Sequence, residues 1–429
     1  MTIPPHFLGY RCSLCGETFD RDYAGYVCPA HGDLGNLDVE LDYAAIGAAV
    51  SPRALPAEAS LWRYLPLLPV GDPGFVGTPL RAAGGTPLYR ATRLGAALGL
   101  TNLWLKDDGR NPTASFKDRA SAVVVARARE IGAGVPRGLE RVVVTASTGN
   151  AGAALAGMAG AVGQPVVIFA PETAPPAKVA QLLIFGARVL LVRGNYDQAF
   201  DLSLAAAREF GWYVRNTGYN AFTAEGKKTA AFEMCEQLTA ATNAPGPGWA
   251  APDVVFVSVG DGNILSGLHK GLVDLAALGW INRVPRLIGV QAEGSAACAR
   301  AWADGCETIA PVSANTLADS INVDLPRDGL RAVRAVRTTR GAFVTVSDEA
   351  ILEAIAALGR DAAVFAEPAG AAAYAGLVQA AQRGLVRANE TIVVVNTGSG
   401  LKDVKAARQA AGRPQVIDLS LEAVRRALV

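Results

Sequence analysis

The sequence predicts an α/β protein with two parallel-sheet, three-layer domains, preceded by a small N-terminal segment. From residue 100 onward, short aliphatic runs such as VVFVSV (254–259) alternate with alanine-rich stretches of helical length, such as ILSGLHKGLVDLAALG (264–279). Strands that are apolar on both faces and alternate with helices are typical of parallel sheets covered by helices on both sides. The polar segment 215–229 interrupts the alternation, so we expect one set of strands and helices before it and a second set after it.

The expected elements follow one another in a regular order. Apolar runs predict strands over 104–108, 141–147, 165–170, 188–194, 254–260, 286–294, 343–348 and 391–400. Alanine-rich patterns predict helices over 116–132, 150–163, 196–211, 264–279 and 348–361. Residues 48–90 are rich in proline and glycine, which predicts a lead-in that wraps over the larger body. The expected division is an N-terminal segment over 1–45, a large domain over 46–117 and 216–429, and a small domain over 118–215.

The composition limits the classes to which the protein can belong. Hydrophobic residues make up 51% of the 429 residues and charged residues 18%, which excludes a mainly disordered chain. Lys and Arg number 40 and Asp and Glu number 39, and the resulting net charge of +1 gives no general attraction to nucleic acid or an anionic membrane. The sequence has no long apolar stretch typical of a membrane span and no signal-peptide pattern, so we expect a soluble cytoplasmic protein.

The N-terminal segment carries a pattern typical of a structural zinc site. Its candidate ligands follow the spacing Cys12-x2-Cys15-x12-Cys28-x2-His31. Three thiolates and one imidazole complete a tetrahedral zinc site with no open position, which serves structure and not catalysis. Reduced cysteines in a loop and a nucleic-acid-binding ribbon are the alternatives, although the flanking residues are not basic. We expect the other cysteines in the core or on helices: Cys235, Cys298 and Cys306.

A lysine stands at the expected start of the helix over 116–132. Ser115 and Asp118 have the spacing of a capping box, which predicts that the helix begins at Phe116. Lys117 then lies in the first turn, where the positive end of the helix dipole lowers the pKa of an ammonium group. A lysine with a lowered pKa is the group that forms Schiff bases with aldehydes. An ordinary solvated lysine is the alternative for Lys117 taken alone.

Three more segments end an expected strand with small polar residues. ASTGNAG (146–152) offers hydroxyls and N–H groups that suit a carboxylate, with a plain helix cap as the alternative. GDGN (260–263) is a glycine-rich turn whose N–H groups can bind a phosphate, and we expect Asp261 to point away from that phosphate or to cap the helix. In NTGSG (396–400), Thr397 places a hydroxyl where it can meet a ring nitrogen, with an ordinary loop as the alternative.

Together these segments describe one ligand. Lys117 suits an aldehyde, the 260–263 turn a phosphate and Thr397 a heteroaromatic nitrogen, which are the three parts of pyridoxal phosphate. The turn over 147–150 is then available for the carboxylate of an amino-acid substrate. Because the carboxyl ends of parallel strands meet at one edge of a sheet, we expect all these groups to share one site.

The sequence resembles the fold-type-II pyridoxal-phosphate enzymes, whose domains are of the tryptophan synthase β-like kind, and among them the threonine synthase family most. The segments that carry the resemblance span nearly the whole chain in the same order: NPTASFKDR, ASTGNAG, AEGKKTAAFE, VQAEGS, TLADSI, VSDEAI, EPAGAAA and TGSGLKD. The resemblance implies a lyase that converts O-phosphohomoserine and water to threonine and phosphate, working as a homodimer without a nucleic-acid or membrane partner. Some threonine synthases carry a similar N-terminal ribbon, so structural zinc is a second expected cofactor.

The resemblance also implies roles for single residues. Lys117 would bind the cofactor covalently and move the protons at Cα and Cβ of the substrate, with Phe116 packed on the cofactor ring. Asn150 would bond the ring O3′ and Thr397 the pyridine nitrogen, and a hydroxyl there suits elimination and replacement chemistry. The remaining expected cofactor ligands hold its phosphate: Gly260, Asp261, Gly262 and Asn263. The expected substrate ligands are Ser147, Thr148 and Asn220.

The substrate side departs from the family pattern. Threonine synthases usually carry an arginine where this sequence has Thr223, and the candidates for a replacement cation are Lys178, Lys227 and Lys228. The GDGN turn has the length seen in threonine and serine dehydratases. Two other enzyme classes therefore stay open, a β-eliminating ammonia-lyase acting on a hydroxy amino acid and a β-replacement synthase acting on a phosphorylated serine. The non-enzyme alternative is a regulatory protein on an inactive enzyme body.

Overall fold

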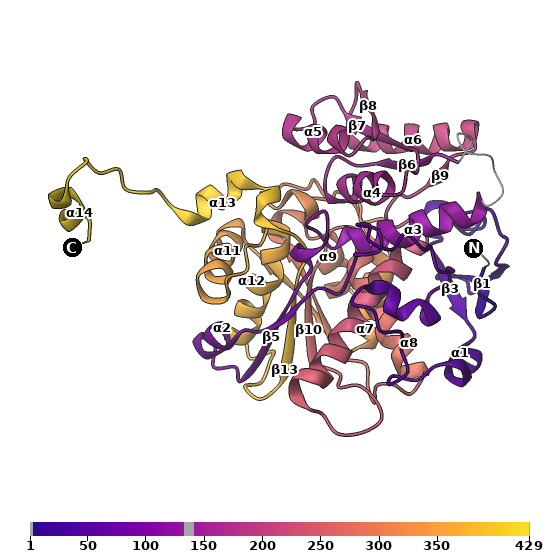
Figure 1. Cartoon of the computed structure of the whole chain (residues 1–429), viewed down its shortest axis with the longest axis horizontal. Coiled ribbons are helices and arrows are strands. Elements are labelled where there is room, and N and C mark those ends of the chain that lie inside the picture. The colour runs from indigo at the N-terminus through magenta and orange to yellow at the C-terminus, as the bar shows by residue number, and fades with distance from the viewer. Residues whose placement is uncertain (1–2, 133–140, 429) are drawn as a thin grey trace.

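The computed structural model describes residues 3–132 and 141–428, which contain three sheets (Figure 1). The first sheet is small and antiparallel, has the order β2-β1-β3 and lies near the N-terminus. Tyr10 in its central strand pairs with Phe19 on one side and Val39 on the other. Asp42 then caps the first helix by accepting a hydrogen bond from the N–H of Ala45 at 2.9 Å. The elements of this segment are β1 (Phe7–Cys12), β2 (Thr18–Asp20), β3 (Leu37–Leu41) and α1 (Tyr43–Ala49).

The second sheet is fully parallel and has the order β8-β7-β6-β9. Its longest helix begins with a reciprocal capping box between Asn195 and Gln198 and ends at Gly211, which adopts a φ of 66° that glycine tolerates best. The strands are β6 (Val143–Ala146), β7 (Val166–Pro171), β8 (Arg188–Val192) and β9 (Tyr213–Val214). The helices that accompany them are α4 (Asn150–Gly160), α5 (Pro176–Ile184) and α6 (Tyr196–Phe210).

The third sheet has the order β12-β11-β10-β13-β5-β4 and is parallel except at β4, which runs antiparallel to β5. Its strand β10 (Val254–Ser258) is buried along its whole length, as expected for a strand between two helix layers. The strands are β4 (Leu88–Arg90), β5 (Asn102–Asp107), β10 (Val254–Ser258), β11 (Arg286–Ala292), β12 (Ala342–Val346) and β13 (Thr391–Asn396). The helices are α2 (Thr92–Ala97), α7 (Phe222–Thr242), α8 (Asn263–Ala277), α9 (Ala297–Ala303), α10 (Gly329–Thr338), α11 (Asp348–Ala362) and α12 (Pro368–Gln382). Helix α3 (Lys117–Ile131) packs on both α7 and α4.

The predicted α/β class with parallel sheets is confirmed, and five strands were not predicted: the three of the first sheet, and β4 and β9 in the two larger sheets. β4 and β9 have three and two residues, which is too short for a recognisable pattern. The domain boundaries predicted from the sequence stay a prediction. What supports them is that β5 joins the third sheet before the chain forms the second sheet, while β10 to β13 join it afterwards.

The lead-in over 48–90 is part of the core as well as a connection. Its 3-10 helix η2 (Leu61–Leu67) packs on α7, and its side chains Trp62 and Tyr64 are buried. The indole N–H of Trp62 donates to the carbonyl of Leu80 at 2.9 Å, and the hydroxyl of Tyr64 donates to Glu236 of α7 at 2.6 Å. These bonds satisfy the polar atoms of two large aromatic side chains that would otherwise be costly to bury.

The chain ends in two helices, α13 (Val404–Ala411) and α14 (Leu421–Leu428). Figure 1 shows α14 away from the body, at the end of an extended stretch over 412–420. None of the helices in the described part of the chain is both long enough and apolar enough to span a lipid bilayer.

Candidate active site

A cavity lies at the carboxyl ends of strands β10 and β13. This is the edge of a parallel sheet at which α/β proteins bind ligands. The starts of four helices, α3, α4, α8 and α12, converge on the cavity. Its lining includes all the residues predicted to bind pyridoxal phosphate: Phe116, Lys117, Asn150, Gly260, Asp261, Gly262, Asn263 and Thr397.

Lys117 is the first residue of α3 and lines this cavity. Burial, followed by the charge of Arg215, lowers the pKa of Lys117 to about 8. The lowered pKa of Lys117 agrees with the prediction. Its largest cause is burial, however, whereas the prediction relied on the helix dipole. Phe116 is fully buried beside it and lines the same cavity.

The predicted capping box at the start of α3 is wrong. The carboxylate of Asp118 turns to Thr113, from which it accepts the backbone N–H at 2.6 Å and the hydroxyl. The hydroxyl of Ser115 is buried and has no hydrogen-bond partner in the described part of the chain. Asp118 therefore ties the preceding loop to the first turn of α3 and positions Lys117 in that way. The same loop is held to the residue after β13 by a hydrogen bond of 2.9 Å from the N–H of Phe116 to the carbonyl of Thr397.

The glycine-rich turn connects β10 to α8. Gly262 has a φ of 93°, and a Cβ added there would lie 2.6 Å from the carbonyl oxygen of Asp328, so only glycine fits. No side chain caps α8, which leaves the N–H groups of its first turn available to an anion. Asp261 does not cap α8; its carboxylate accepts a hydrogen bond from the N–H of Arg327 at 3.4 Å, and burial raises the pKa of its carboxyl group. The expectation that Asp261 points away from a bound phosphate stays a prediction.

Asn263 links this turn to α7. Its Oδ1 accepts hydrogen bonds from Nζ of Lys227 and, at 3.1 Å, from the hydroxyl of Thr223. Its Nδ2 donates to Asp328 at 2.7 Å. With every polar atom of its amide engaged, Asn263 holds the turn in a fixed position relative to α7 and α10.

A buried carboxylate that the sequence analysis missed lies opposite Asn150. Glu367 is the residue before Pro368, the first residue of α12, and it lines the cavity. Nδ2 of Asn150 donates to both of its carboxylate oxygens, at 2.7 and 3.0 Å. Burial raises the pKa of Glu367. An acidic residue followed by proline at a helix start was the signal in the sequence, within the segment EPAG.

The three residues predicted to bind the substrate lie in different places. Thr148 lines an adjoining cavity that shares Asn150 and Glu367 with the first one. Ser147 lies in the turn between β6 and α4 and lines neither of these cavities. Asn220 lines a separate cavity, and its amide bonds the carbonyl of Val214 and the N–H of residue 222, at 2.7 and 2.9 Å. The substrate-binding roles of these residues stay predictions.

Two further polar groups beside the cavity were also missed. Ser258 lines the cavity, and its buried hydroxyl has no hydrogen-bond partner in the described residues. Arg215 is fully buried, and its Nη1 donates to the hydroxyl of Thr217, another lining residue, at 2.7 Å. Arg215 directly follows β9, so a strand of only two residues hid its position at a strand end.

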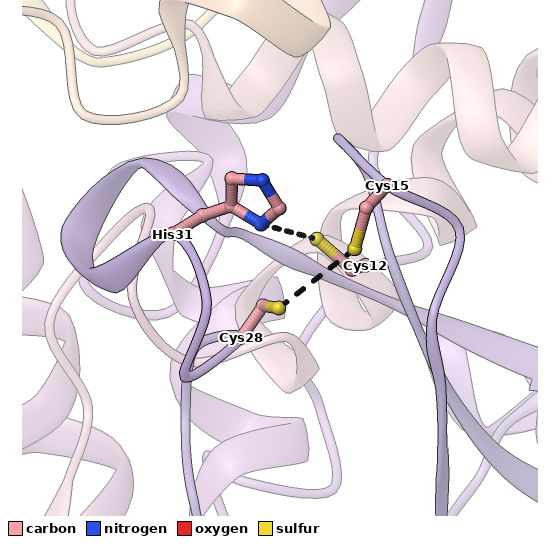
Figure 2. A group of neighbouring side chains, drawn as sticks. All are labelled: Cys12, Cys15, Cys28 and His31. Carbon is pink, nitrogen blue, oxygen red and sulfur yellow. Dashed lines mark hydrogen bonds between the residues drawn. The ribbon is translucent and has the colours of Figure 1, made fainter.

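The predicted zinc ligands come together in the N-terminal segment (Figure 2). The ligand atoms of Cys12, Cys15, Cys28 and His31 all lie within 4.8 Å of one another. Sγ of Cys12 lies 3.8 Å from Nδ1 of His31, and Sγ of Cys15 lies 3.9 Å from Sγ of Cys28. A closed set of three thiols and one imidazole is a donor set that zinc prefers.

The other cysteines lie outside this cluster. Cys235 on α7 and Cys298 on α9 are buried, as expected. The expectation for Cys306 is wrong, because Cys306 is exposed in the loop after α9, where a glycine turn ends the helix early.

Comparison with solved structures shows the fold of the chain. The structure is similar to the processed form of threonine deaminase isoform 2 from Solanum lycopersicum, with a TM-score of 0.63 and 22% identity over 80% of this chain and 91% of that one. It is also similar to diaminopropionate ammonia lyase from Escherichia coli, with a TM-score of 0.64 and 21% identity over 76% of this chain and 86% of that one.

Comparison of sequences shows the family. Residues 80–398 match the family described as pyridoxal-phosphate dependent enzyme. The chain is 37% identical to a threonine synthase of Methanocaldococcus jannaschii over 97% of this chain and 98% of that protein. It is 36% identical to a threonine synthase of Mycobacterium tuberculosis over 79% of this chain and 87% of that protein. The chain belongs to the pyridoxal-phosphate-dependent enzyme family that includes these threonine synthases.

Proposed function

We propose that the protein is a threonine synthase, which converts O-phosphohomoserine and water to threonine and phosphate. The observation that carries the proposal is that Lys117 and the glycine-rich turn over 260–263 line one cavity. This arrangement offers an amine of lowered pKa and a phosphate-binding helix start to the same ligand. The near full-length similarity to threonine synthases favours this reaction over the other reactions of the family.

The residues of the cavity fit pyridoxal phosphate. The turn at Gly262 has no room for a Cβ and leaves the first-turn N–H groups of α8 uncapped, which suits the phosphate. Lys117 suits the aldehyde, and the unpartnered hydroxyl of Ser258 offers a further polar contact. Phe116 and Ala369 provide apolar lining for a ring.

The chemistry divides between the cofactor and the side chains. When bound, pyridoxal phosphate withdraws electrons from the amino acid, so that protons at its Cα and Cβ become removable. Lys117 is the group that carries these protons, because its lowered pKa lets Nζ both accept and return a proton near neutral pH. Overall, the Cγ–O bond to phosphate breaks, Cβ loses one proton and Cγ gains one, and water supplies a hydroxyl group to Cβ and a proton to the released phosphate. Asn150 and Thr397 hold the ring through their polar atoms.

The test is phosphate release coupled to threonine formation. Purified protein reconstituted with pyridoxal phosphate is supplied with O-phosphohomoserine, and both products are measured in the same reaction. Equal molar amounts of phosphate and threonine support the proposal. Formation of 2-oxo acid from serine or threonine, without threonine from O-phosphohomoserine, identifies an ammonia-lyase instead.

We also propose that Cys12, Cys15, Cys28 and His31 bind one structural zinc ion. The clustering of their ligand atoms supports this site. We expect Cys12→Ser to lose the metal, measured as zinc per chain by elemental analysis. Cys306→Ser removes an exposed cysteine outside the cluster and is the matched control. Full zinc content in Cys12→Ser would contradict the site.

The protein's assembly and location complete the proposal. A homodimer is what the resemblance to threonine synthases implies, and the cytoplasm is the location expected from the sequence. Mass measurement of the protein in solution by light scattering tests the dimer.

A further inference from the structure

Two arginines of α10 bind the N-terminal segment that carries the candidate zinc ligands. Arg331 and Arg334 are three residues apart on α10 and therefore lie on the same face of the helix. Nη1 of Arg334 donates to the carbonyl of Ser13 at 2.5 Å. Nη1 of Arg331 donates to the carbonyl of Leu37 at 3.3 Å and to the carboxylate of Asp38 at 2.5 Å. These charge-assisted hydrogen bonds tie α10 to the first sheet.

The carbonyl groups that accept these bonds lie next to a candidate zinc ligand. Leu37 of β3 is the residue that pairs with Cys12 of β1, and Ser13 directly follows Cys12 in the chain. Ser13 also donates its N–H to the carbonyl of Asn36, the residue before β3, at 2.9 Å. A change in the position of Cys12 therefore changes the position of both carbonyls that bind α10.

Arg331 also reaches the glycine-rich turn, through one carboxylate. Asp328, the residue before α10, is buried and accepts hydrogen bonds from Nε and Nη2 of Arg331. Its Oδ2 also accepts the hydrogen bond from Nδ2 of Asn263, at 2.7 Å. Its backbone N–H donates to the carbonyl of Asp261 at 2.9 Å, and its own carbonyl is the group that excludes a Cβ at Gly262. Asp328 thus contacts three consecutive residues of the turn.

We propose that Arg331 is a positioning residue that couples the candidate zinc site to the phosphate-binding turn over 260–263. With metal bound, the ligands fix the first sheet, and the sheet fixes the outer contacts of Arg331 and with them the carboxylate of Asp328. Without metal, Arg331 keeps its pair with Asp328 but no longer holds that carboxylate in one position. The turn then binds a phosphate less tightly, because its N–H groups are less well preorganised.

The coupling is partial, because the turn has a second support. Thr223 and Lys227 of α7 donate to Oδ1 of Asn263, and neither contact involves the N-terminal segment. Loss of metal is therefore expected to weaken cofactor binding and not to abolish it. The effect is also reciprocal: chain loaded with pyridoxal phosphate holds zinc more tightly than cofactor-free chain, by the same factor.

The experiment breaks the outer contact of Arg331 and leaves its buried pair intact. A variant without Arg331 can fail to fold, since the buried carboxylate of Asp328 would lack its cation. Asp38→Lys instead sets a like charge against Arg331 from a side chain that is 41% exposed. Asp20→Lys makes the same change of charge at an exposed position of the same sheet and is the matched control.

The measured quantity is the dissociation constant of pyridoxal phosphate from the full chain, with and without zinc. In wild type and in Asp20→Lys, we expect removal of zinc by a chelator to weaken cofactor binding at least about fivefold, the lower end of ordinary coupling between sites. Zinc-loaded Asp38→Lys is expected to bind cofactor as weakly as metal-free wild type, and removal of its zinc to change binding by less than about twofold. Asp38→Glu keeps the carboxylate and is expected to behave as wild type.

A second readout needs no cofactor. Hydrogen exchange of the first-turn amides of α8 is expected to accelerate when zinc is removed from the wild-type chain, and to be equally fast in zinc-loaded Asp38→Lys. Amides of β7 in the second sheet are the internal reference, and their exchange is expected to stay unchanged. Faster exchange in both places would mean that zinc stabilises the whole chain, which overturns a specific role of Arg331.

The remaining outcomes also decide the question. An equal effect of zinc removal in wild type and in Asp38→Lys overturns the role of Arg331, and no effect in wild type overturns the coupling. If the chain binds no zinc, the zinc site is refuted, and equal cofactor affinity in Asp38→Lys and Asp20→Lys then overturns the positioning role. Turnover enters none of these measurements, so failure of the proposed reaction is distinguishable from failure of this inference.

Discussion

Asn150 and Glu367 join the two parallel sheets across the candidate active site. Nδ2 of Asn150, at the start of α4, donates to both carboxylate oxygens of Glu367, at the start of α12, with distances of 2.7 and 3.0 Å. α4 packs on the second sheet and α12 on the third. The contact therefore fixes the relative position of the elements that line the cavity.

We expect Asn150→Ala to lower the free energy of unfolding of the apoprotein by about 1–3 kcal/mol, because it leaves the buried carboxylate of Glu367 without its donor. Urea unfolding measures the change.

Asn150→Asp places a second carboxylate beside that of Glu367, and burial already raises the pKa of Glu367. The folded state disfavours the ionised form of the Glu367 carboxyl group. We therefore expect Asn150→Asp to lose stability as pH rises above the ordinary pKa of a glutamate. A variant as stable at high pH as at low pH would contradict this account.

The buried ion network beside the lead-in makes a second prediction. Arg119 donates to Asp108 at 2.6 Å and to Glu233 at 2.7 Å, and all three side chains are almost completely buried. Arg119→Met leaves the buried carboxylate of Asp108 without a cationic partner and leaves Glu233 with Lys106 alone, and it is expected to cost about 3–5 kcal/mol of stability. Arg93→Ala breaks the exposed pair with Asp361 and is expected to cost about 1 kcal/mol or less. Equal costs in the two variants, measured by urea unfolding, are the outcome that this explanation excludes.

Gly262 provides a third prediction, because the turn depends on the absence of a side chain. Gly262→Ala adds both a positive-φ cost and a clash with the carbonyl of Asp328 at 2.6 Å. Gly279→Ala, at the end of α8, has a φ of 69° and open space around the added Cβ, so it carries only the φ cost of about 1 kcal/mol. We expect Gly262→Ala to weaken cofactor affinity at least about tenfold, measured by equilibrium titration, while Gly279→Ala leaves it unchanged. An equal loss of cofactor affinity in Gly262→Ala and Gly279→Ala would contradict the role of the Gly262 turn in binding the cofactor.

The fourth prediction concerns pH. Burial lowers the pKa of Lys117 to about 8, and the neutral amine is the form that reacts with an aldehyde. The folded state disfavours the charged form, so the neutral fraction grows as pH rises through 8. Uptake of pyridoxal phosphate by the apoprotein is therefore expected to accelerate up to about pH 8 and to level off above it. A rate that keeps rising toward the ordinary lysine pKa of 10.5 would show that Lys117 is not perturbed.

Long apolar strands and the residues that follow them were predictable from the sequence. Apolar runs such as 254–259 indicate a strand, because a strand buried on both faces consists of aliphatic residues. Once that strand is placed, the GDGN turn is placed at its carboxyl end. The cluster of Cys12, Cys15, Cys28 and His31 was predictable because ligand spacing is a local property, and the four ligand atoms lie within 4.8 Å of one another. The family was predictable because its motifs are short, ordered and spread over the whole chain.

Hydrogen bonds that depend on how the chain folds back on itself were not predictable from the sequence. Asp118 has the spacing to pair with Ser115, but Thr113 takes its carboxylate because the loop folds back on the helix. Glu367 meets Asn150 only when two sheets come together, and the 217 positions that separate them carry no local signal. Arg215 was hidden for a related reason, because the strand before it is too short to show a period.

The central claim is that Lys117 binds pyridoxal phosphate in the cavity beside the glycine-rich turn. Borohydride reduction of the reconstituted protein, followed by proteolysis and mass spectrometry, tests it most directly. We predict one cofactor-derived label per chain on the peptide that contains Lys117, and none in Lys117→Ala. A label on another lysine, or no label on a protein that has taken up the cofactor, would contradict the account.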